Sequence, residues 1–284
     1  GDGFVGRYLS NALIERGENV VVGDILSTLD ERINKKAKFI NVDIRDKSAI
    51  RKIDIMPDDL VINLAANQYH TKVPKNRKEY FYSTNYVGTK NILEVMEEKN
   101  CMRYLMFTTD MTYGKPQYLP VDMNSTIFRP RMINGPGRLG ILVKLFKLID
   151  MNLPVPTIGN GKNHYQMISV FDCVSAILCA IDKGLPNKEY NLGSKNPPDI
   201  RTLLQGVVTS ADKHSIVIPT SGKLVKLVLG LLDKYGFTLM YPEQFMIADE
   251  EYVLDIQETE KDLDWHPQYS DEDMLKEAYK MYKK

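Results

Sequence analysis

The sequence lacks a charge bias. Its 284 residues include 37 lysines and arginines and 37 aspartates and glutamates, so the formal net charge is zero. Proteins that bind nucleic acid or an anionic membrane usually carry an excess of basic residues. We therefore expect neither nucleic acid nor a membrane among the partners of this protein.

Cysteines are scarce and apolar runs are short. The three cysteines, Cys101, Cys173 and Cys179, form no C-x-x-C pair, and such a set is typical of buried thiols in a reducing compartment. No apolar run reaches the ~18 residues that a membrane-spanning helix needs. The four histidines show no spacing typical of a metal site. The sequence thus predicts a cytoplasmic globular protein without a metal.

A glycine-rich stretch opens the sequence. Residues Gly1–Gly6 read G-x-G-x-x-G, an amphipathic helix follows as far as Gly17, and a strand at Val20–Val22 then leads to Asp24. Glycines let the backbone approach a pyrophosphate, the helix N-terminus offers free N–H groups, and the acidic residue accepts hydrogen bonds from a ribose diol. This order predicts a dinucleotide site, with an ordinary glycine-rich turn as the alternative.

The strand that should precede such a turn is missing. In a doubly wound sheet of order 3-2-1-4-5-6 that strand is central, and without it strands 2 and 4 have nothing between them to pair with. We therefore expect the natural polypeptide to be longer than this sequence.

Strands and helices alternate along the rest of the chain, which indicates a parallel sheet. The predicted strands are Ala37–Val42, Leu60–Leu64, Arg103–Phe107, Ser125–Phe128 and Lys188–Leu192. The predicted helices are Glu79–Lys99, Leu139–Met151, Phe171–Lys183, Ile200–Ala211, Lys223–Lys234, Glu258–Leu263 and Ser270–Tyr282. This pattern predicts an α/β fold: a doubly wound Rossmann-type parallel sheet at residues 1–135, and a smaller mixed α/β substrate domain, mainly residues 136–284, with some segments returning to the first domain.

A crossover helix is also missing. Two parallel neighbouring strands need a connection of a dozen or more residues, usually a helix. The connection Thr109–Asn124 contains Gly114, Pro116 and Pro120 and has no helical period. We place a break near Asp122–Asn124.

Eight motifs occur in the order typical of one family. They are the glycine turn; Asp43-Ile44; Leu64-Ala65-Ala66; Asn85-x-x-Gly88-Thr89-x-Asn91; residues 108–114 (T-T-D-M-T-Y-G); Arg129-Pro130 with residues 134–138 (N-G-P-G-R); Val170-x-Asp172; and residues 190–193 (Y-N-L-G). On these motifs almost the whole chain resembles the extended short-chain dehydrogenase/reductases, specifically the NAD-dependent sugar-nucleotide epimerase/dehydratase family.

The resemblance implies NAD as the cofactor. The residues that it assigns to NAD are Gly1, Gly3, Phe4, Val5, Asp24, Asp43, Ile44, Leu64, Ala65, Ala66, Gln68, Asn85 and Thr108. A carboxylate at Asp24 would repel a 2′-phosphate, which favours NAD over NADP. For Asn85, hydrogen bonds to neighbouring loops are an equal alternative to a cofactor contact.

The family oxidises a sugar carbon with a Ser or Thr, a Tyr and a Lys. The Tyr removes the hydroxyl proton, the Lys lowers the Tyr pKa, and the Ser or Thr orients the reacting oxygen. Thr109 matches the Ser/Thr position, with a strand-end cap as its alternative role, and Asp110 beside it is also assigned to catalysis.

The Tyr-x-x-x-Lys pair is absent from its expected place. The same spacing at Tyr86/Lys90 and at Tyr279/Lys283 is interpreted as coincidence, because the first pair precedes Thr109 and the second lies on the last helix. We hypothesise that the catalytic pair lies in a segment between Asp122 and Ser125 that this sequence does not contain. A contiguous full-length sequence would refute this hypothesis.

Departures from the family pattern bear on the substrate. Met111 stands where 4,6-dehydratases carry a Glu, and a methionine cannot move a proton. Tyr165 stands where many relatives have an Arg that contacts a nucleotide phosphate, and Arg138 is the candidate diphosphate contact, with a solvated helix-start Arg as the alternative. His70, which follows the cofactor loop, is interpreted as a structural histidine, and His164 with Tyr165 is a candidate to face the substrate.

The expected function is therefore an NAD-dependent epimerase that acts on a nucleotide-diphosphate sugar through a transient keto intermediate. One alternative is a nucleotide-sugar reductase or dehydrogenase, and another is a non-catalytic NAD sensor. The resemblance also implies a homodimer that forms through the helix Glu79–Lys99 and the missing crossover helix.

Overall fold

The computed structural model describes residues 1–68, 73–109, 124–138 and 142–283. The chain forms two compact units, and each is built from three separate segments. Unit 1 comprises Gly1–Pro130, Cys173–Leu192 and Ile256–Trp265, and unit 2 comprises Arg131–Asp172, Gly193–Asp255 and His266–Lys284. The functional roles predicted for residues 1–135 and 136–284 stay predictions.

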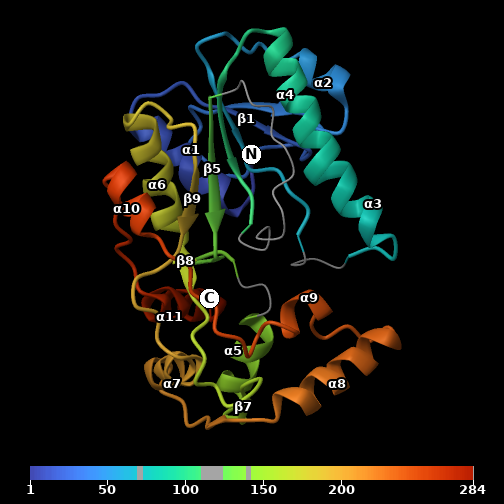
Figure 1. Cartoon of the computed structure of the whole chain (residues 1–284), viewed down its shortest axis with the longest axis vertical. Helices are drawn as coiled ribbons and strands as arrows, with labels where there is room; N and C mark the ends of the chain where they lie inside the picture. Colours follow the sequence, from blue (N-terminus) through green and yellow to red (C-terminus); the bar gives the residue numbers. More distant parts are fainter. Residues whose placement is uncertain (69–72, 110–123, 139–141, 284) are drawn as a thin grey trace. The chain divides into compact units, whose positions relative to one another are not determined.

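Unit 1 is a parallel α/β structure (Figure 1). Its strands are β1 (Val21–Asp24), β2 (Lys38–Asn41), β3 (Leu60–Asn63), β4 (Arg103–Phe107), β5 (Asn124–Pro130) and β9 (Glu189–Leu192). Its helices are α1 (Phe4–Glu15), α2 (Lys47–Arg51), α3 (Arg77–Phe81), the π-helix η1 (Tyr82–Gly88), α4 (Thr89–Glu98), α10 (Gln257–Leu263) and most of α6 (Val170–Asp182).

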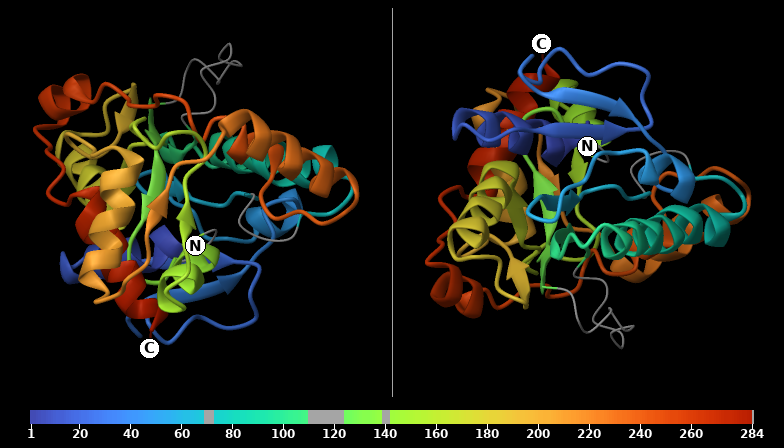
Figure 2. Two further views of the ribbon diagram at one scale, coloured as in Figure 1. Left: turned by 90° about the horizontal axis from the view of Figure 1, so that it is seen from below. Right: turned by 90° about the horizontal axis from the view of Figure 1, so that it is seen from above.

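The strands of unit 1 form two sheets. One is the parallel pair β1–β2, seen in Figure 2, and the other is the parallel sheet β3-β4-β5-β9. Strands β4 and β5 are parallel neighbours, with Arg103 opposite Asn124, as the sequence predicted. Within the described residues no strand joins β1 to β3, which is the place where the glycine-turn topology calls for a further strand.

The long helix predicted at Glu79–Lys99 is present but not uniform. It begins at Arg77, after Asn76, whose side chain accepts a hydrogen bond from Glu79 N, and its middle turn is a π-helix. α4 then packs on α2 and the sheet. The core that they share comprises Val42, Ile50, Ile92, Leu93, Val95, Met96, Cys101 and Tyr104.

Unit 2 is a smaller mixture of helices and short strands. Its strands are β6 (Met132–Asn134), β7 (Val155–Pro156), β8 (Met167–Ser169) and β10 (Val217–Ile218). Its helices are α5 (Leu142–Asp150), α7 (Ile200–Ser210), α8 (Gly222–Lys234), α9 (Pro242–Phe245) and α11 (Asp271–Tyr282). Its core packs α5, α7 and α11 together around Phe146, Val207 and Leu275.

Polar caps set where the helices of unit 2 begin. The side chain of Asp199 accepts a hydrogen bond from Thr202 N at 2.9 Å at the start of α7. Ser270 does the same for Asp273 N at 3.1 Å at the start of α11. The four short strands have two or three residues each, too few to leave an alternating pattern in the sequence.

Candidate cofactor site

The glycine turn is closed on one side and open on the other. A side chain at Gly6 would overlap the carbonyl oxygen of Gly1, and one at Gly1 would come within 2.6 Å of Gly23 O. A Cβ at Gly3 would meet nothing within 4 Å. The first helical hydrogen bond of α1 runs from Arg7 N to Gly3 O, so the N-terminus of the helix lies at Gly3. The turn thus offers open space at a helix N-terminus.

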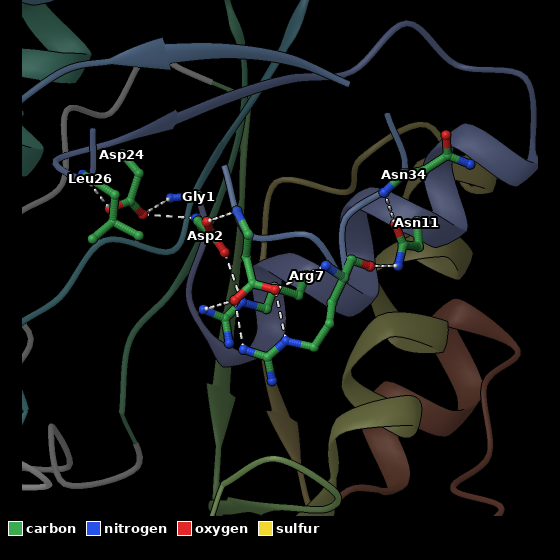
Figure 3. Close-up of polar contacts among 9 residues, drawn as sticks. Gly1, Asp2, Arg7, Asn11, Asp24, Leu26 and Asn34 are labelled. Carbon is green, nitrogen blue, oxygen red and sulfur yellow. Dashed lines mark hydrogen bonds and ion pairs between the residues drawn. The ribbon is translucent and has the colours of Figure 1, made fainter. Parts of the chain in front are cut away.

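Asp24 lies at the end of β1 and faces the glycine turn (Figure 3). Its Oδ2 accepts hydrogen bonds from Gly1 N at 3.1 Å and from Asp2 N at 2.8 Å, and its Oδ1 accepts one from Leu26 N at 3.3 Å. Partial burial opposes ionisation of Asp24, and the hydrogen bonds from Asp2 N and Leu26 N favour its charged form. A charged acceptor is therefore held beside the turn.

Asp2 holds the turn in place, a role that the sequence analysis missed. Its buried carboxylate pairs with Arg7 Nε at 2.7 Å and accepts a hydrogen bond from Asp30 N at 2.7 Å. Arg7 also pairs with Asp30 at 3.0 Å, so the loop after β1 is tied to the start of α1 (Figure 3). The sequence did contain a signal for this role: Asp2 occupies the variable position of G-x-G, and Arg7 lies five residues after it.

Asp43 and Ile44, two of the residues assigned to NAD, follow β2. The Asp43 carboxylate pairs with Arg45, with its Oδ2 at 2.6 Å from Nη2, and this hydrogen bond lowers the pKa of Asp43. Ile44 lies against Gly88, where an added Cβ would come within 2.5 Å of it, and its carbonyl accepts a hydrogen bond from Asn91 Nδ2 at 3.0 Å. The motif on the long helix therefore positions this loop.

The motif Leu64-Ala65-Ala66 follows β3, and the side chain of Asn63 holds its backbone. Buried Asn63 accepts a hydrogen bond from Ala65 N at 3.1 Å and donates through Nδ2 to Tyr104 OH and Thr89 Oγ1, each at 3.1 Å. A single polar residue in the apolar run L-V-I-N-L was the signal for this support. Leu64 and Ala65 are half-buried, and Ala66 is exposed.

Asn85 is hydrogen-bonded to the backbone of Asn67 in both directions. Its Oδ1 accepts from Asn67 N at 2.7 Å, and its Nδ2 donates to Asn67 O at 3.1 Å. This contact is the loop-holding alternative considered for Asn85, and a direct cofactor contact remains a prediction. Gln68, next in the loop, is exposed.

The predicted catalytic threonine follows β4. Thr108 N donates to Phe128 O at 2.9 Å, which keeps the chain in register with β5 one residue before Thr109, and Thr109 itself is exposed. Asp110, Met111 and His70 lie outside the described residues, as does most of the connection that follows Thr109.

Both coincidental Tyr/Lys pairs have structural partners. The ring of Tyr86 stacks on Tyr82 with centroids 4.9 Å apart. Tyr279 is buried against Phe146, and Lys283 pairs with Asp150 at 2.6 Å. Nothing in these contacts joins either pair to Thr109.

Tyr165 and Arg138 belong to unit 2. The guanidinium of buried Arg131 lies over the ring of Tyr165 at 4.5 Å and over that of Tyr252 at 3.9 Å. His164, beside Tyr165, has its Nδ1 2.7 Å from Glu251. Arg138 is half-buried and follows the turn at Gly135. Their assignments to substrate binding stay predictions.

The residues present in unit 1 fit NAD. An open helix N-terminus suits a pyrophosphate, and an ionised carboxylate at a strand end suits a ribose diol. Among the described residues no group of three or more His, Cys, Asp or Glu side chains could hold a metal ion. The helices in the described ranges include none long and apolar enough to span a bilayer.

Comparison with known proteins finds a family model and several relatives that are similar to this chain. Residues 1–131 match the model of the NAD dependent epimerase/dehydratase family. The uncharacterized protein y4nG of Sinorhizobium fredii is 26% identical over 314 residues, which cover 99% of this chain and 77% of that protein. A UDP-glucose 4-epimerase of Streptomyces lividans is 32% identical over 145 residues, 50% of this chain and 43% of that enzyme.

The fold is that of solved epimerases. The crystal structure of UDP-glucuronic acid 4-epimerase from Bacillus cereus in complex with NAD superposes with a TM-score of 0.72 and 18% identity, covering 99% of this chain and 96% of that one. The predicted α/β Rossmann-type class is thereby confirmed.

Proposed function

The chain belongs to the NAD-dependent epimerase/dehydratase family, a family of enzymes whose cofactor is NAD, and on that premise we propose that it is an epimerase of a nucleotide-diphosphate sugar. The family, its enzymatic nature and its cofactor agree with the sequence-based expectation. The particular reaction is our proposal, and the NAD-dependent reductase or dehydrogenase remains the second candidate.

One observation carries the proposal: the open glycine turn faces a carboxylate that its own backbone holds in place. In this arrangement the N-terminus of α1 holds the pyrophosphate at Gly3, and Asp24 accepts from the adenosine ribose through its remaining lone pairs. Bound NAD supplies a reversible hydride acceptor for the sugar carbon. The loops at Ile44 and Asn67 are each held by a side chain of the long helix, and so they form rigid walls for the same cofactor.

The chemistry at the sugar requires a proton acceptor beside Thr109. In the proposal Thr109 orients the reacting oxygen, and a tyrosine with a lowered pKa takes the hydroxyl proton. The alignment with y4nG spans 314 residues, more than the 284 of this chain, so that relative carries internal residues without a counterpart here. We propose that a segment near Asp122–Ser125 is among these residues and carries the tyrosine and lysine.

Relatives support a UDP-sugar as the substrate class. The S. lividans enzyme is named for UDP-glucose, and the B. cereus enzyme for UDP-glucuronic acid. We assign Arg138 to the diphosphate and Tyr165 to the substrate by the same analogy. The absence of a dehydratase Glu after Asp110 favours epimerisation over water elimination.

We also propose that the protein is a homodimer formed through the long helix. The stacked rings of Tyr82 and Tyr86 are each 49% exposed on the π-helical turn. Sedimentation velocity of the natural full-length protein tests this proposal, and a monomer at all concentrations refutes it.

The cofactor site is tested with Asp24→Asn. Removing the charge weakens hydrogen bonds worth about 1.5–3 kcal/mol, so the Kd for NAD should rise about 10- to 100-fold in titration calorimetry. The exposed Asp54→Asn serves as the matched control and should bind NAD normally. Equal affinities in all three proteins would remove Asp24 from the site.

The reaction is tested by following UDP-glucose, UDP-galactose and UDP-glucuronic acid with catalytic amounts of NAD. An epimerase interconverts the sugars without net NADH, whereas a dehydrogenase or reductase consumes NAD or NADH stoichiometrically. Intact mass must come first, because it decides whether the segment with the tyrosine and lysine is present. A natural protein that has no such segment and no turnover, but still binds NAD, would be a sensor.

A further inference from the structure

Helix α8 of unit 2 exposes an apolar face. Leu224, Leu227, Val228 and Leu231 have exposed fractions of 60%, 60%, 46% and 47%, and none of the residues of α8 is buried. Their spacing of i, i+3, i+4 and i+7 places them on one side of the helix. A soluble helix normally turns such a stripe toward the core, so this stripe calls for a partner.

The apolar face continues beyond the end of α8. Tyr235 and Phe237 are 74% and 69% exposed. Gly236 has a φ of +84°, and Phe237 N donates to Leu232 O at 2.8 Å, so the backbone that carries Phe237 is tied to the end of the helix. Two exposed aromatic residues at the edge of a leucine stripe suit the boundary between water and lipid, where aromatic side chains concentrate.

The outward orientation of this face is fixed by contacts on the other side of α8. Lys226 pairs with Asp249 and donates to Met246 O at 2.7 Å. Helix α9 lies against α8, and buried Phe245 approaches Gly230 (Figure 1). The helix is therefore held in place with its leucines outside.

The charges of α8 indicate what the face contacts. Because Lys226 is paired with Asp249, Lys223 and Lys234 are the lysines that remain, and they outnumber the one acidic residue of the helix, Asp233, whose Oδ1 accepts a hydrogen bond from Thr238. At ~100° per residue, Lys223 and Lys234 lie along the same border of the apolar stripe, and both are exposed. The zero net charge of the whole chain conceals this local excess.

We propose that α8, with Tyr235 and Phe237, docks the protein on the surface of an anionic lipid bilayer. An interfacial helix combines an exposed apolar face with lysines that reach acidic headgroups, and α8 has both features. A second copy of this chain suits the face less well, because two such faces would bring their lysines together. The helix lies on the membrane rather than through it, since its 13 residues are too few to span one.

The test is co-sedimentation of the full chain with vesicles. Wild type should bind vesicles of phosphatidylglycerol in phosphatidylcholine, and binding should be at least tenfold weaker to phosphatidylcholine alone or at high salt. Leu227→Ser with Leu231→Ser should weaken binding to the anionic vesicles at least tenfold. The matched control is Met151→Ser with Ile216→Ser, two side chains that are 67% and 69% exposed outside this face, and it should bind like wild type.

A second pair of variants tests the charges. Lys223→Glu with Lys234→Glu should reduce binding at least tenfold at low salt and leave the circular dichroism spectrum unchanged. The proposal is overturned if wild type does not bind anionic vesicles. It is also overturned if the control variant, Met151→Ser with Ile216→Ser, loses as much vesicle binding as the leucine variant. Concentration-dependent dimers that only the leucine variant dissociates, without vesicle binding, would assign the face to a second copy instead.

Discussion

Asp271 should make the stability of this protein fall as the pH rises above about 4. Its side chain, at the start of α11, is almost wholly buried and accepts a hydrogen bond from Met167 N at 3.1 Å. Burial raises the pKa of Asp271 from 3.8 to about 6, although Ser194, Met167 N–H and the charge of Arg131 favour the ionised form. Desolvation therefore outweighs three favourable contacts.

The sign of the effect follows from the raised pKa. Below the unfolded pKa the carboxyl is protonated in both states, and its contribution to stability is fully present. As the pH rises through about 6, the folded chain must bury a charge that the unfolded chain exposes to water. A pKa difference of about two pH units corresponds to about 3 kcal/mol of unfolding free energy lost between about pH 4 and about pH 7.

The assay is urea denaturation of wild type and Asp271→Asn across that range, followed by circular dichroism. Asparagine cannot ionise but keeps an oxygen for Met167 N–H, so the variant should gain about 3 kcal/mol relative to wild type from about pH 4 to about pH 7. Asp212→Asn, at an exposed carboxylate of the same unit, controls for charge loss. If the stability difference between Asp271→Asn and wild type does not change with pH, then Asp271 is solvated and the reasoning from its burial is wrong.

Two further perturbations test the cofactor site. Gly6→Ala places a methyl group against the Gly1 carbonyl oxygen, so the turn must open and NAD affinity should fall more than tenfold in titration calorimetry; unchanged affinity would show that the turn is not closed as described. Asn85→Ala removes both hydrogen bonds to the Asn67 backbone and should lower the unfolding free energy by about 2 kcal/mol in denaturation experiments; no loss would mean that water replaces both bonds.

Much of unit 1 could be predicted from local pattern. The predicted strand Arg103–Phe107, which is apolar from Tyr104 onward, is β4 with the same bounds, because a buried parallel strand is marked by continuous apolar residues. The helix and the strand predicted after the glycine turn are present as α1 and β1. The division of the sheet between β1 and β3 also agrees with the strand order that the turn implies.

The supports of the candidate site could not be predicted in the same way. The pairing of Asp2 and Arg7 with Asp30, and the hydrogen bonds of Asn63 with Tyr104, join residues far apart in sequence. A hydrogen bond depends on distance and angle, which spacing along the chain does not specify across elements. The π-helical turn of η1 is likewise invisible to a period of 3.6 residues.

The sequence by itself indicated the family resemblance, the cofactor class and the order of the strands, because these depend on residue types at fixed short spacings. Only the tertiary structure decided which polar groups are buried and which apolar faces stay uncovered. The sequence of α8 specifies a leucine stripe, but it does not specify whether other elements cover that stripe. Likewise, the sequence around Asp271 resembles any helix start with an aspartate, and only the packing of other elements around it makes the carboxyl buried. The burial of a side chain depends on the residues packed around it, and these residues come from distant parts of the chain.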